Sequence, residues 1–566
     1  MENNFSSISK FAEVNNDLLS VEDNCYFWKT ETVVKGKKQE PVINMISNFI
    51  IEPLYLLRSQ HNPKRIFKIV NHLDQSETLT CSVKSMTNIG EFKAVVEAQG
   101  NFIINAQFEQ YAHIKESIYA QEKNAVEIDT LGHQLGTSLY AFGNGIFDGK
   151  KFYSVNDFGI CTIGENNYFI PEYSEIYIHD AAYTERRKFK YKQGKADVTQ
   201  WSKLILECFG TNGNVGIGYI VACLFRDVIF NKIGRFPMLY LFGAPQSGKS
   251  TFRDSFMYLF GDPQTTPSLG SASSPKSFNR KLAQYRNGLI VFEEYKNDIQ
   301  TSLIEMLKGI YDGIGYERAE TSNDNRTKTT PVNSSVIVCG QEMPTKEAAL
   351  FSRSIMLVFE KTKFDSTENK AYSLLKTTQS QGLGQVLTEI LKHRQLIVER
   401  FKSEFDSILH DLINDTMQTE NFPQRWLENL AVIIAPFKIL QDVVNFGFDY
   451  TKLLHTLCDN MKVQGAIMRE NNEVNTFFEV LDELIEKNMI SKDDYTDDIT
   501  DINRCLSFCY KSIYGQYVAQ CKRENLRPIE KQSLTSYLKT SHGFKEYKQK
   551  KIGKKIKWFF QFEFKI

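Results

Sequence analysis

The amino-acid sequence predicts an α/β core that carries a phosphate-binding loop. A mixed α/β N-terminal domain is expected before this core, and helical segments and a C-terminal winged helix after it. Three observations indicate this fold: an apolar run that ends in Gly-x-x-x-x-Gly-Lys-Ser, a second apolar run that ends in two glutamates, and two helical patterns followed by an alternating, lysine-rich one at the end of the chain. Apolar strands that alternate with helical segments are typical of a parallel sheet.

The composition is that of an ordinary multidomain globular protein. The chain has 566 residues, 42% of them hydrophobic and 13% aromatic, with 68 Lys+Arg against 68 Asp+Glu. At about 150 residues per domain, this length allows three or four domains. The neutral charge balance excludes a protein that coats nucleic acid by bulk charge, and the aromatic content excludes a disordered or collagen-like chain.

No targeting or membrane segment is recognisable in the sequence. The start, Met1–Phe5, lacks the basic and apolar regions of a signal peptide. The longest apolar stretch, Ile217–Phe225, is about half a membrane span and is followed directly by two charged residues. The ten cysteines include no Cys-x-x-Cys pair, which fits reduced thiols. We therefore expect a soluble intracellular protein without a membrane partner.

Shifts in composition divide the chain into five expected parts. Residues 1–190 are strand-prone and contain no recognisable primase or nuclease motif, so their role stays open. An acidic stretch, Asp493–Asp501, is expected to separate off a terminal block. The expected parts are a mixed N-terminal domain at 1–190, a helical linker at 191–235, the α/β core at 236–365, a helical domain at 366–495 and a winged helix at 496–566.

A phosphate-binding loop is predicted between a strand at Met238–Phe242 and a helix at Thr251–Phe260. Its glycines let backbone amides turn toward a β-phosphate, and the helix N-terminus adds its dipole. Lys249 would reach the β- and γ-oxygens, and Ser250 would offer its hydroxyl to Mg²⁺. A surface turn with a stray Gly-Lys-Ser is the alternative. The residues expected to bind ATP are Gly243, Ala244, Pro245, Gln246, Ser247, Gly248, Lys249, Ser250 and Thr251.

A second apolar run, Gly288–Phe292, ends in Glu293 and Glu294. In a buried parallel strand, these acids emerge at the carboxyl end, beside the phosphate loop. Glu293 would hold Mg²⁺ through water, and Glu294 would orient and deprotonate the attacking water. The usual first acid is Asp, so the extra methylene of Glu293 leaves open which glutamate does which task. A strand that ends in solvated acids is the alternative.

Two further strands are expected at Ser335–Cys339 and Ser354–Phe359. Gln341 follows the first and is the candidate to hydrogen-bond the γ-phosphate or the attacking water. Arg353 directly precedes the second and would project to the γ-phosphate held by a neighbouring subunit, because guanidinium is permanently charged and bidentate. A surface salt bridge is the alternative for Arg353.

These five elements in this order resemble the AAA+ P-loop ATPases. More narrowly, they resemble the superfamily III and MCM-like replicative helicases of phages and mobile elements, such as those of staphylococcal cassette chromosomes. Three further segments are similar to that group: Gly313–Arg318, Gly340–Glu342 and Arg425–Ala431. The resemblance covers about residues 195–450.

The resemblance implies a ring, expected to be a hexamer, with ATP and Mg²⁺ at subunit interfaces and single-stranded DNA in the central channel. Translocation would be coupled to hydrolysis, on single-stranded or forked DNA, in the cytoplasm of a bacterial host, with possible replication partners. The resemblance also implies an arginine of the kind called sensor 2. The sequence does not decide whether it is Arg394, Arg400 or Arg425.

The resemblance also implies a DNA-contacting hairpin before the third strand. Here that stretch is Tyr316–Thr330, with a turn at Asn323-Asp324-Asn325. Its cations could instead be solvated or pair with Glu317 and Glu320. The candidate DNA contacts are Arg318, Arg326 and Lys328.

The terminal block is predicted to be a winged helix. Helices are expected at Leu506–Asn525 and Ser533–Leu538, followed by a hairpin with its turn at Ile552-Gly553. Eight lysines and two glutamates between Lys545 and Ile566 give this stretch a net charge of +6, which favours phosphate contact. A solubilising hairpin is the alternative. The candidate contacts are Lys548, Lys550, Lys551, Lys554 and Lys555.

Together these patterns predict an ATP-dependent replicative DNA helicase. An origin-binding initiator or helicase loader and a non-replicative AAA+ defence ATPase are the alternatives. The basic terminal hairpin and the cations of the earlier hairpin argue against the defence ATPase.

Overall fold

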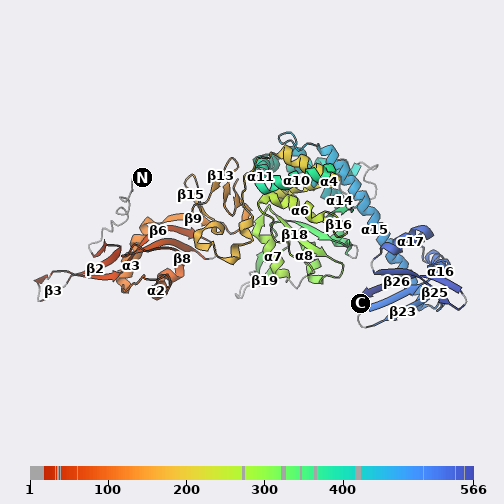
Figure 1. Ribbon diagram of the computed structural model, residues 1–566, viewed down its shortest axis with the longest axis horizontal. Helices are drawn as coiled ribbons and strands as arrows, with labels where there is room; N and C mark the ends of the chain where they lie inside the picture. The colour runs from red at the N-terminus through yellow and green to blue at the C-terminus, as the bar shows by residue number, and fades with distance from the viewer. Residues whose placement is uncertain are drawn as a thin grey trace.

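The computed structural model describes residues 18–31, 33–34, 37–38, 40–59, 62–270, 274–319, 327–344, 347–361, 366–414, 422–500, 503–541, 543–553 and 555–565. Figure 1 shows three parts that follow one another along the long axis. The N-terminal strands lie at one end, an α/β body lies in the middle, and a domain that carries the C-terminus lies at the other end.

The N-terminal part is mixed α/β, as its strand-prone sequence predicts. It contains a three-stranded antiparallel sheet, β1-β2-β5, and a six-stranded sheet in the order β14-β15-β9-β6-β7-β8. Phe67, Phe92 and Tyr111 form a buried aromatic core between the larger sheet and its helices. The elements are β1 (Leu19–Glu22), β2 (Cys25–Thr30), β3 (Val33–Val34), β4 (Lys37–Lys38), β5 (Val42–Ser47), β6 (Phe49–Arg58), β7 (Lys64–Asn71), β8 (Ser76–Ser82), α1 (Val83–Thr87), α2 (Ile89–Glu97), α3 (Phe108–Gln121), β9 (Lys123–Glu127), β14 (Ile160–Ile163) and β15 (Asn166–Phe169).

A third sheet joins the N-terminal part to the central body. Its order is β13-β12-β11-β10-β17, and β10 runs parallel to β17, which lies more than a hundred residues further along the chain. Gly132 makes this pairing possible, because a Cβ there would lie 2.0 Å from the carbonyl oxygen of Arg286. The strands are β10 (Leu131–His133), β11 (Tyr140–Phe142), β12 (Gly145–Phe147), β13 (Phe152–Ser154) and β17 (Tyr285–Arg286).

A buried polar cluster holds the same junction together. Asp227 accepts hydrogen bonds from Arg394 at 3.0 and 2.5 Å and from the side chain of Asn287 at 2.7 Å. The Nε2 atom of His133 lies 3.4 Å from Asp227. Burial, with a further contribution from Arg394, lowers the pKa of His133 to about 4, so this imidazole is neutral in the folded protein at neutral pH.

The central body is built on a sheet of four parallel strands in the order β18-β21-β16-β22. These are the four predicted strands, and their apolar runs are buried, as expected for a parallel sheet covered on both faces. The strands are β16 (Met238–Gly243), β18 (Leu289–Tyr295), β21 (Ser335–Gly340) and β22 (Ser354–Phe359).

Helices pack around this sheet. Figure 1 shows α4, α10 and α14 above it and α7 and α8 below it. The second half of α4 is buried against α14, whose apolar residues are also buried. The helices are α4 (Val198–Leu224), α5 (Arg226–Ile233), α6 (Lys249–Met257), α7 (Pro275–Gln284), α8 (Thr301–Tyr311), α9 (Ala348–Phe351), α10 (Ser366–Gln381), α11 (Gly384–Leu391), α12 (Arg394–Asn414), α14 (Gln424–Leu440) and α15 (Tyr450–Glu486).

The predicted hairpin before β21 is present as β19 (Tyr316–Ala319) and β20 (Thr327–Thr330), which pair antiparallel. Its predicted turn at 323–325 lies outside the described residues.

Among the described residues, no single helix is long and apolar enough to cross a membrane. Only α4 and α5 taken together, with a bend of 77° between them, meet the criteria of length and composition.

The end of α15 enters the terminal domain and packs there with Phe508, Tyr517 and Phe560. The domain has a four-stranded antiparallel sheet in the order β23-β24-β26-β25. Its second helix and its final hairpin lie where the sequence predicts them. The elements are β23 (Tyr495–Ile499), β24 (Asn503–Phe508), α16 (Tyr510–Arg523), α17 (Lys531–Thr540), β25 (Phe544–Ile552) and β26 (Lys555–Lys565).

Two details of the terminal block differ from the sequence prediction. The expected helix does not begin at Leu506, because residues 503–508 form β24, in which Leu506 and Phe508 face the core with the period of two of a strand. The acidic stretch also does not lie between the terminal block and the helices before it, as expected. Part of it forms β23, where Asp497 pairs with Arg504 at 2.6 Å.

The neutral, buried His133 predicts a loss of stability in acid. Its pKa in the unfolded chain is about 6.5, so below that pH the unfolded state binds a proton that the folded state refuses until about pH 4. The stability contribution is therefore complete above pH 6.5 and is lost as the pH falls toward 4, by an amount on the order of 3 kcal/mol. Urea unfolding of His133→Asn should show a weaker pH dependence over this window.

The exposed His410 provides the matched control. The variant His410→Asn should keep the wild-type pH dependence. A His133→Asn protein whose stability falls as steeply as that of the wild type between pH 6.5 and 4 would contradict the assignment.

Candidate functional site

The loop between β16 and α6 has the backbone shape that a phosphate cradle needs. Gln246 has a φ of 63° and Gly248 a φ of 93°, and such left-handed residues turn successive amides to one side. Gly243 is required for a different reason, because a Cβ there would lie 2.3 Å from the carbonyl oxygen of Phe359. The loop then leads directly into the N-terminus of α6, which begins at Lys249.

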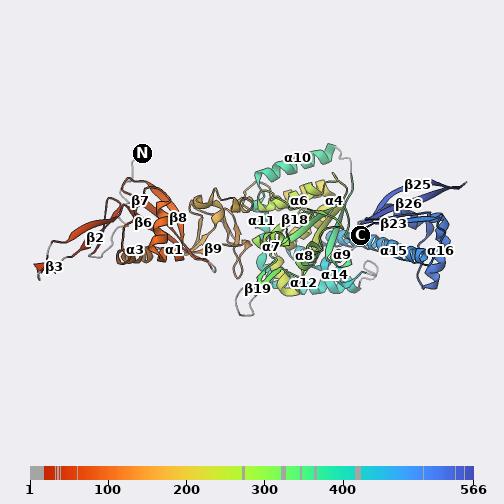
Figure 2. The ribbon, with the colours of Figure 1, turned by 90° about the horizontal axis from the view of Figure 1, so that it is seen from below.

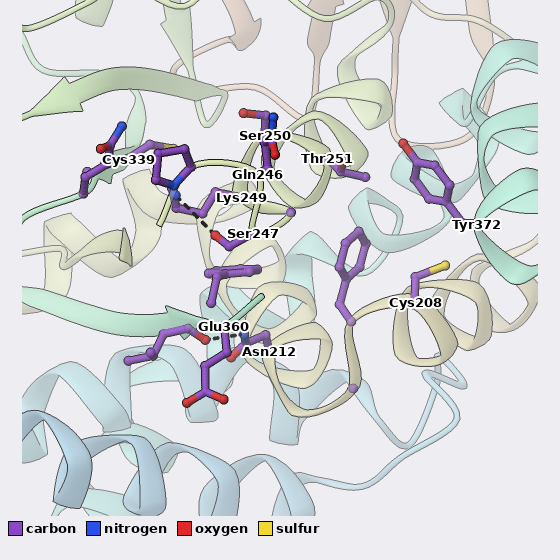
Figure 3. Close-up of a pocket in the computed structure, with 18 of the residues that line it drawn as sticks. Cys208, Asn212, Gln246, Ser247, Lys249, Ser250, Thr251, Cys339, Glu360 and Tyr372 are labelled. Carbon is purple, nitrogen blue, oxygen red and sulfur yellow. Dashed lines mark hydrogen bonds between the residues drawn. The ribbon is translucent and has the colours of Figure 1, made fainter. Parts of the chain in front are cut away.

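Lys249 folds back onto its own loop. Its ammonium donates hydrogen bonds to the carbonyl oxygens of Gly243 at 2.6 Å and Ala244 at 2.8 Å and to the Ser247 hydroxyl at 3.3 Å. Burial lowers the pKa of Lys249. Figure 3 shows this lysine within the curve of the loop, where a bound phosphate would replace neutral acceptors with charged ones.

A pocket of about 830 Å³ opens beside the loop. It brings together most of the predicted site residues, although they come from three separate segments of the chain. Gly243 and Ala244 do not line it and contribute through their carbonyl contacts with Lys249. The predicted residues that line it are Pro245, Gln246, Ser247, Gly248, Lys249, Ser250, Thr251, Glu293, Glu294 and Gln341.

The two glutamates lie at the carboxyl end of β18 and are held differently. Glu293 is ion-paired with Arg253 of α6 at 2.5 Å and accepts a hydrogen bond from Thr266 at 3.0 Å. Glu294 has a φ of 58° and accepts a hydrogen bond from Ser268. The reversed backbone at Glu294 interrupts the alternation of the strand, so that both carboxylates reach the pocket.

Ser250 and Glu293 fit a magnesium ion that arrives with a phosphate ligand. Both supply oxygen donors to the same pocket, and Mg²⁺ is usually bound by one or two carboxylates together with substrate phosphates. No cluster of three His, Cys, Asp or Glu side chains suited to a metal occurs in the described part of the chain. Because Arg253 is already paired with the Glu293 carboxylate, a magnesium ion that binds there would have to share this carboxylate with the guanidinium.

Gln341 follows β21 and is exposed to the pocket. The next residue fixes the course of this segment, because the carbonyl of Glu342 accepts a hydrogen bond from Tyr240 and its carboxylate accepts one from the backbone of Asn297 at 2.8 Å. Gln341 is thereby anchored at the end of β21, the strand beside β16, which leads into the phosphate loop.

Arg353 does not line the pocket of its own chain. It precedes β22, and its carbonyl accepts a hydrogen bond from the amide of Met238 at the start of β16, whereas the pocket lies at the other end of these strands. Its guanidinium bonds to Asp312 at 3.2 Å and to the Ala349 carbonyl at 3.0 Å and lies over the ring of Tyr311.

The three sensor-2 candidates also lie away from the pocket lining. Arg394 is tied to Asp227, and Arg400 pairs with Glu404 on the surface of α12. Arg425 lies over the same Tyr311 ring as Arg353 does.

The wall of the pocket opposite the phosphate loop was not predicted. It comes from a kink in α4, where Gly210 has φ 52° and ψ −128°, and from the segments after β22. Asn212 donates a hydrogen bond to the carbonyl of Val358 at 3.0 Å and fixes this wall to the sheet. The run Gly-Thr-Asn-Gly at 210–213 within a helical pattern was the available signal. Figure 3 shows Cys208, Asn212, Glu360 and Tyr372 on this side.

No protein-family profile and no curated protein matches the chain. One solved structure, the SCCmec type IV Cch active helicase, matches 97% of this chain and 97% of its own length, with a TM-score of 0.51 and 12% sequence identity. The chain has the fold of this helicase.

Two other solved structures match less well. The NrS-1 C-terminal region matches 90% of this chain and 96% of its own length at 11% identity, with a TM-score of 0.27. The JCV helicase matches 38% of this chain and 71% of its own length at 18% identity, with a TM-score of 0.20. The fold assignment therefore rests on the Cch helicase. It confirms the predicted resemblance, and the match extends from the predicted residues 195–450 to 97% of the chain.

The residues predicted to contact DNA differ in whether their side chains are described, engaged with a neighbouring residue, or exposed. Arg318 and Lys328 occupy opposed positions of β19 and β20, and their side chains lie outside the described set, as do residues Arg326 and Lys554. Lys548 pairs with Glu546, and Lys550 donates a hydrogen bond to Ser507 at 3.0 Å. Lys551 and Lys555 are exposed.

Two Gly→Ala substitutions in helices should change the free energy of unfolding in opposite directions. Gly210→Ala should lower the free energy of unfolding by about 1–3 kcal/mol, because an alanine resists its backbone angles. Gly515 lies within α16 with nothing within 4 Å of an added Cβ, so Gly515→Ala should raise stability by about 0.5–1 kcal/mol. Urea unfolding measures both. A neutral Gly210→Ala would show that the kink is not required.

Proposed function

We propose that this protein is an ATP-driven DNA helicase, a ring-forming translocase on single-stranded DNA that serves replication of a phage or mobile element. One observation carries the proposal: a phosphate loop, two carboxylates and a glutamine meet in one pocket at the carboxyl end of a parallel sheet, in a chain with the fold of a helicase.

The central sheet supports an AAA+ core. β21, which Gln341 follows, lies between β16, which leads into the phosphate loop, and β18, which carries the two glutamates near its end. The terminal helices with their antiparallel hairpin support a winged helix. The five parts 1–190, 191–235, 236–365, 366–495 and 496–566 remain our proposed division of the chain.

In the proposed mechanism, Lys249 exchanges its loop carbonyls for the β- and γ-phosphate oxygens of ATP. Ser250 and Glu293 would hold Mg²⁺, which would neutralise developing charge on the phosphates. Glu294 accepts the proton of the attacking water, and Gln341 orients that water or the γ-phosphate. Ser268 keeps Glu294 in place by its hydrogen bond.

The position of Arg353 supports a site that two subunits share. Arg353 lies at the amino ends of the strands, and the pocket lies at their carboxyl ends. A strand of six residues spans about 20 Å, so this arginine does not reach the γ-phosphate bound to its own chain. In a closed ring, head-to-tail contacts place it at the neighbour's pocket. It would exchange Asp312 for the phosphate.

A shared site predicts complementation between two inactive proteins. Lys249→Ala should abolish ATP hydrolysis, and Arg353→Ala should lower it by a factor on the order of 10³, by analogy with other arginine fingers. Mixing the two variants should restore hydrolysis, because one interface then joins an intact phosphate loop to an intact Arg353. The measurement is phosphate release with and without single-stranded DNA.

Lys402→Ala is the matched control and should hydrolyse ATP at the wild-type rate, because Lys402 pairs with Asp406 on the exposed surface of α12. Co-purification of differently tagged variants establishes that mixed oligomers form. Mixed oligomers that stay inactive would contradict the shared site, and wild-type protein without ATP hydrolysis would contradict the proposed function.

A further inference from the structure

The terminal hairpin carries an apolar strip that continues past the domain core. In the β25–β26 register, Trp558 lies opposite Gln549 and Ile556 lies opposite Lys551. Alternate residues of a strand share one face, so Ile556 and Trp558 continue the face that Phe560 and Phe562 bury against the helices. Trp558 is 38% exposed and Ile556 is 66% exposed. Figure 2 shows this hairpin extending beyond α16 at the end of the molecule.

The strip is organised as an aromatic platform. The rings of Trp558 and Tyr547 stack with their centroids 4.8 Å apart and their planes 21° from parallel. Tyr547 in turn contacts Phe560 of the core at 4.4 Å, and the ammonium of Lys539 lies 5.2 Å from the Tyr547 ring. The core therefore fixes the orientation of the exposed indole, which is not left to rotate freely in solvent.

The lysines of the hairpin fall into two groups. Lys548, Lys550 and Lys557 are engaged with Glu546, Ser507 and Asp494, respectively. Lys551 and Lys555 are exposed, and the ammonium of neither makes a hydrogen bond or ion pair with the described part of the chain. Lys551 shares the face of the strip, whereas Lys555, the residue before Ile556, lies on the opposite face at the tip of the hairpin. Among the hairpin lysines whose side chains the structure describes, these two ammonium groups thus lie at the exposed end of the strip, one on each face.

We propose that the surface formed by Tyr547, Ile556 and Trp558 stacks on unpaired bases, while Lys551 and Lys555 contact the adjoining phosphates. Within a duplex each base is covered by its stacked neighbours, so duplex DNA exposes base faces only at its two ends. A single strand offers a π-face and a charge together. The net charge of +6 between Lys545 and Ile566 complements the strand. The inference deepens the proposed function, because it assigns the terminal domain to the unwound strand of a fork.

The test uses full-length protein and two fluorescein-labelled probes, an oligo-dT strand and a blunt duplex of the same length. Trp558→Ala should weaken oligo-dT binding about 5- to 100-fold, the effect of one lost base stack, and should change duplex binding little. Trp558→Phe should restore most of the affinity. Replacing both Lys551 and Lys555 by Ala should reduce the salt slope of oligo-dT binding by about 1.4, whereas Trp558→Ala should leave that slope unchanged.

A local signal separates the strip from DNA bound elsewhere on the protein. Oligo-dT should quench tryptophan emission in the wild type, and this quenching should disappear in Trp558→Phe. Ile499 on β23 of the same domain is as exposed as Ile556 of the strip, at 66%, so Ile499→Ala is the control for removing an exposed apolar side chain from this domain and should bind oligo-dT as the wild type does.

Three results would overturn the proposal: wild-type oligo-dT affinity in Trp558→Ala, an equal loss of single-strand and duplex binding, or a loss in Ile499→Ala as large as that in Trp558→Ala. Oligo-dT that binds the wild type without quenching its tryptophan emission would also overturn it. ATP hydrolysis without DNA should be unchanged in every variant. A wild-type protein that binds oligo-dT through Trp558 without hydrolysing ATP would contradict the proposed helicase function and leave the base-stacking surface intact.

Discussion

The pairing of β16 with its two neighbours determines where each candidate catalytic group lies. Leu239 is in register with Ile337 of β21 on one side and with Ile355 of β22 on the other, and all of these strands are buried. A shift of the register by one residue would exchange the faces of a strand. The phosphate loop, Gln341 and the two glutamates can share a pocket only because these parallel strands end at one edge.

The same parallel arrangement separates the two ends of the site. Lys249 and Glu294 lie at the carboxyl edge, while Arg353 lies at the amino edge beside Met238. No rotation of side chains brings them together within one chain. The proposed chemistry therefore requires an oligomer. In that mechanism Arg353 would leave Asp312 for the phosphate, and Glu293 would be shared between Arg253 and the bound ion.

The sequence predicted the four central strands well, because each is a short apolar run bounded by turn residues. It also named ten of the residues that line the pocket, those of the phosphate loop with Glu293, Glu294 and Gln341, but none of the wall that α4 and the end of β22 provide. The kink at Gly210 was missed because the flanking residues keep a helical pattern. The strand at Leu506 was missed because three residues of alternation were too few to distinguish from a helix. Contacts distant in sequence, such as Arg253 with Glu293, leave no local signal at all.

The terminal hairpin shows why charge counts alone are a weak guide. Four of the five predicted lysines lie on its described strands, yet a neighbouring acid and a hydroxyl already engage two of them. The structure thereby distinguishes the lysines that are engaged from those that are exposed, and it shows that Trp558 on the same hairpin is partly exposed.

The most direct measurement is strand separation of a forked DNA duplex by the purified protein with ATP and Mg²⁺, compared with that by Glu294→Gln. ATP-dependent separation by the wild type is expected. The variant should bind ATP and DNA but leave the fork intact, because water is no longer deprotonated. A wild-type protein that hydrolyses ATP on DNA without opening the fork would contradict a stand-alone helicase and favour an initiator or loader. Separation by Glu294→Gln at the wild-type rate would contradict the catalytic assignment.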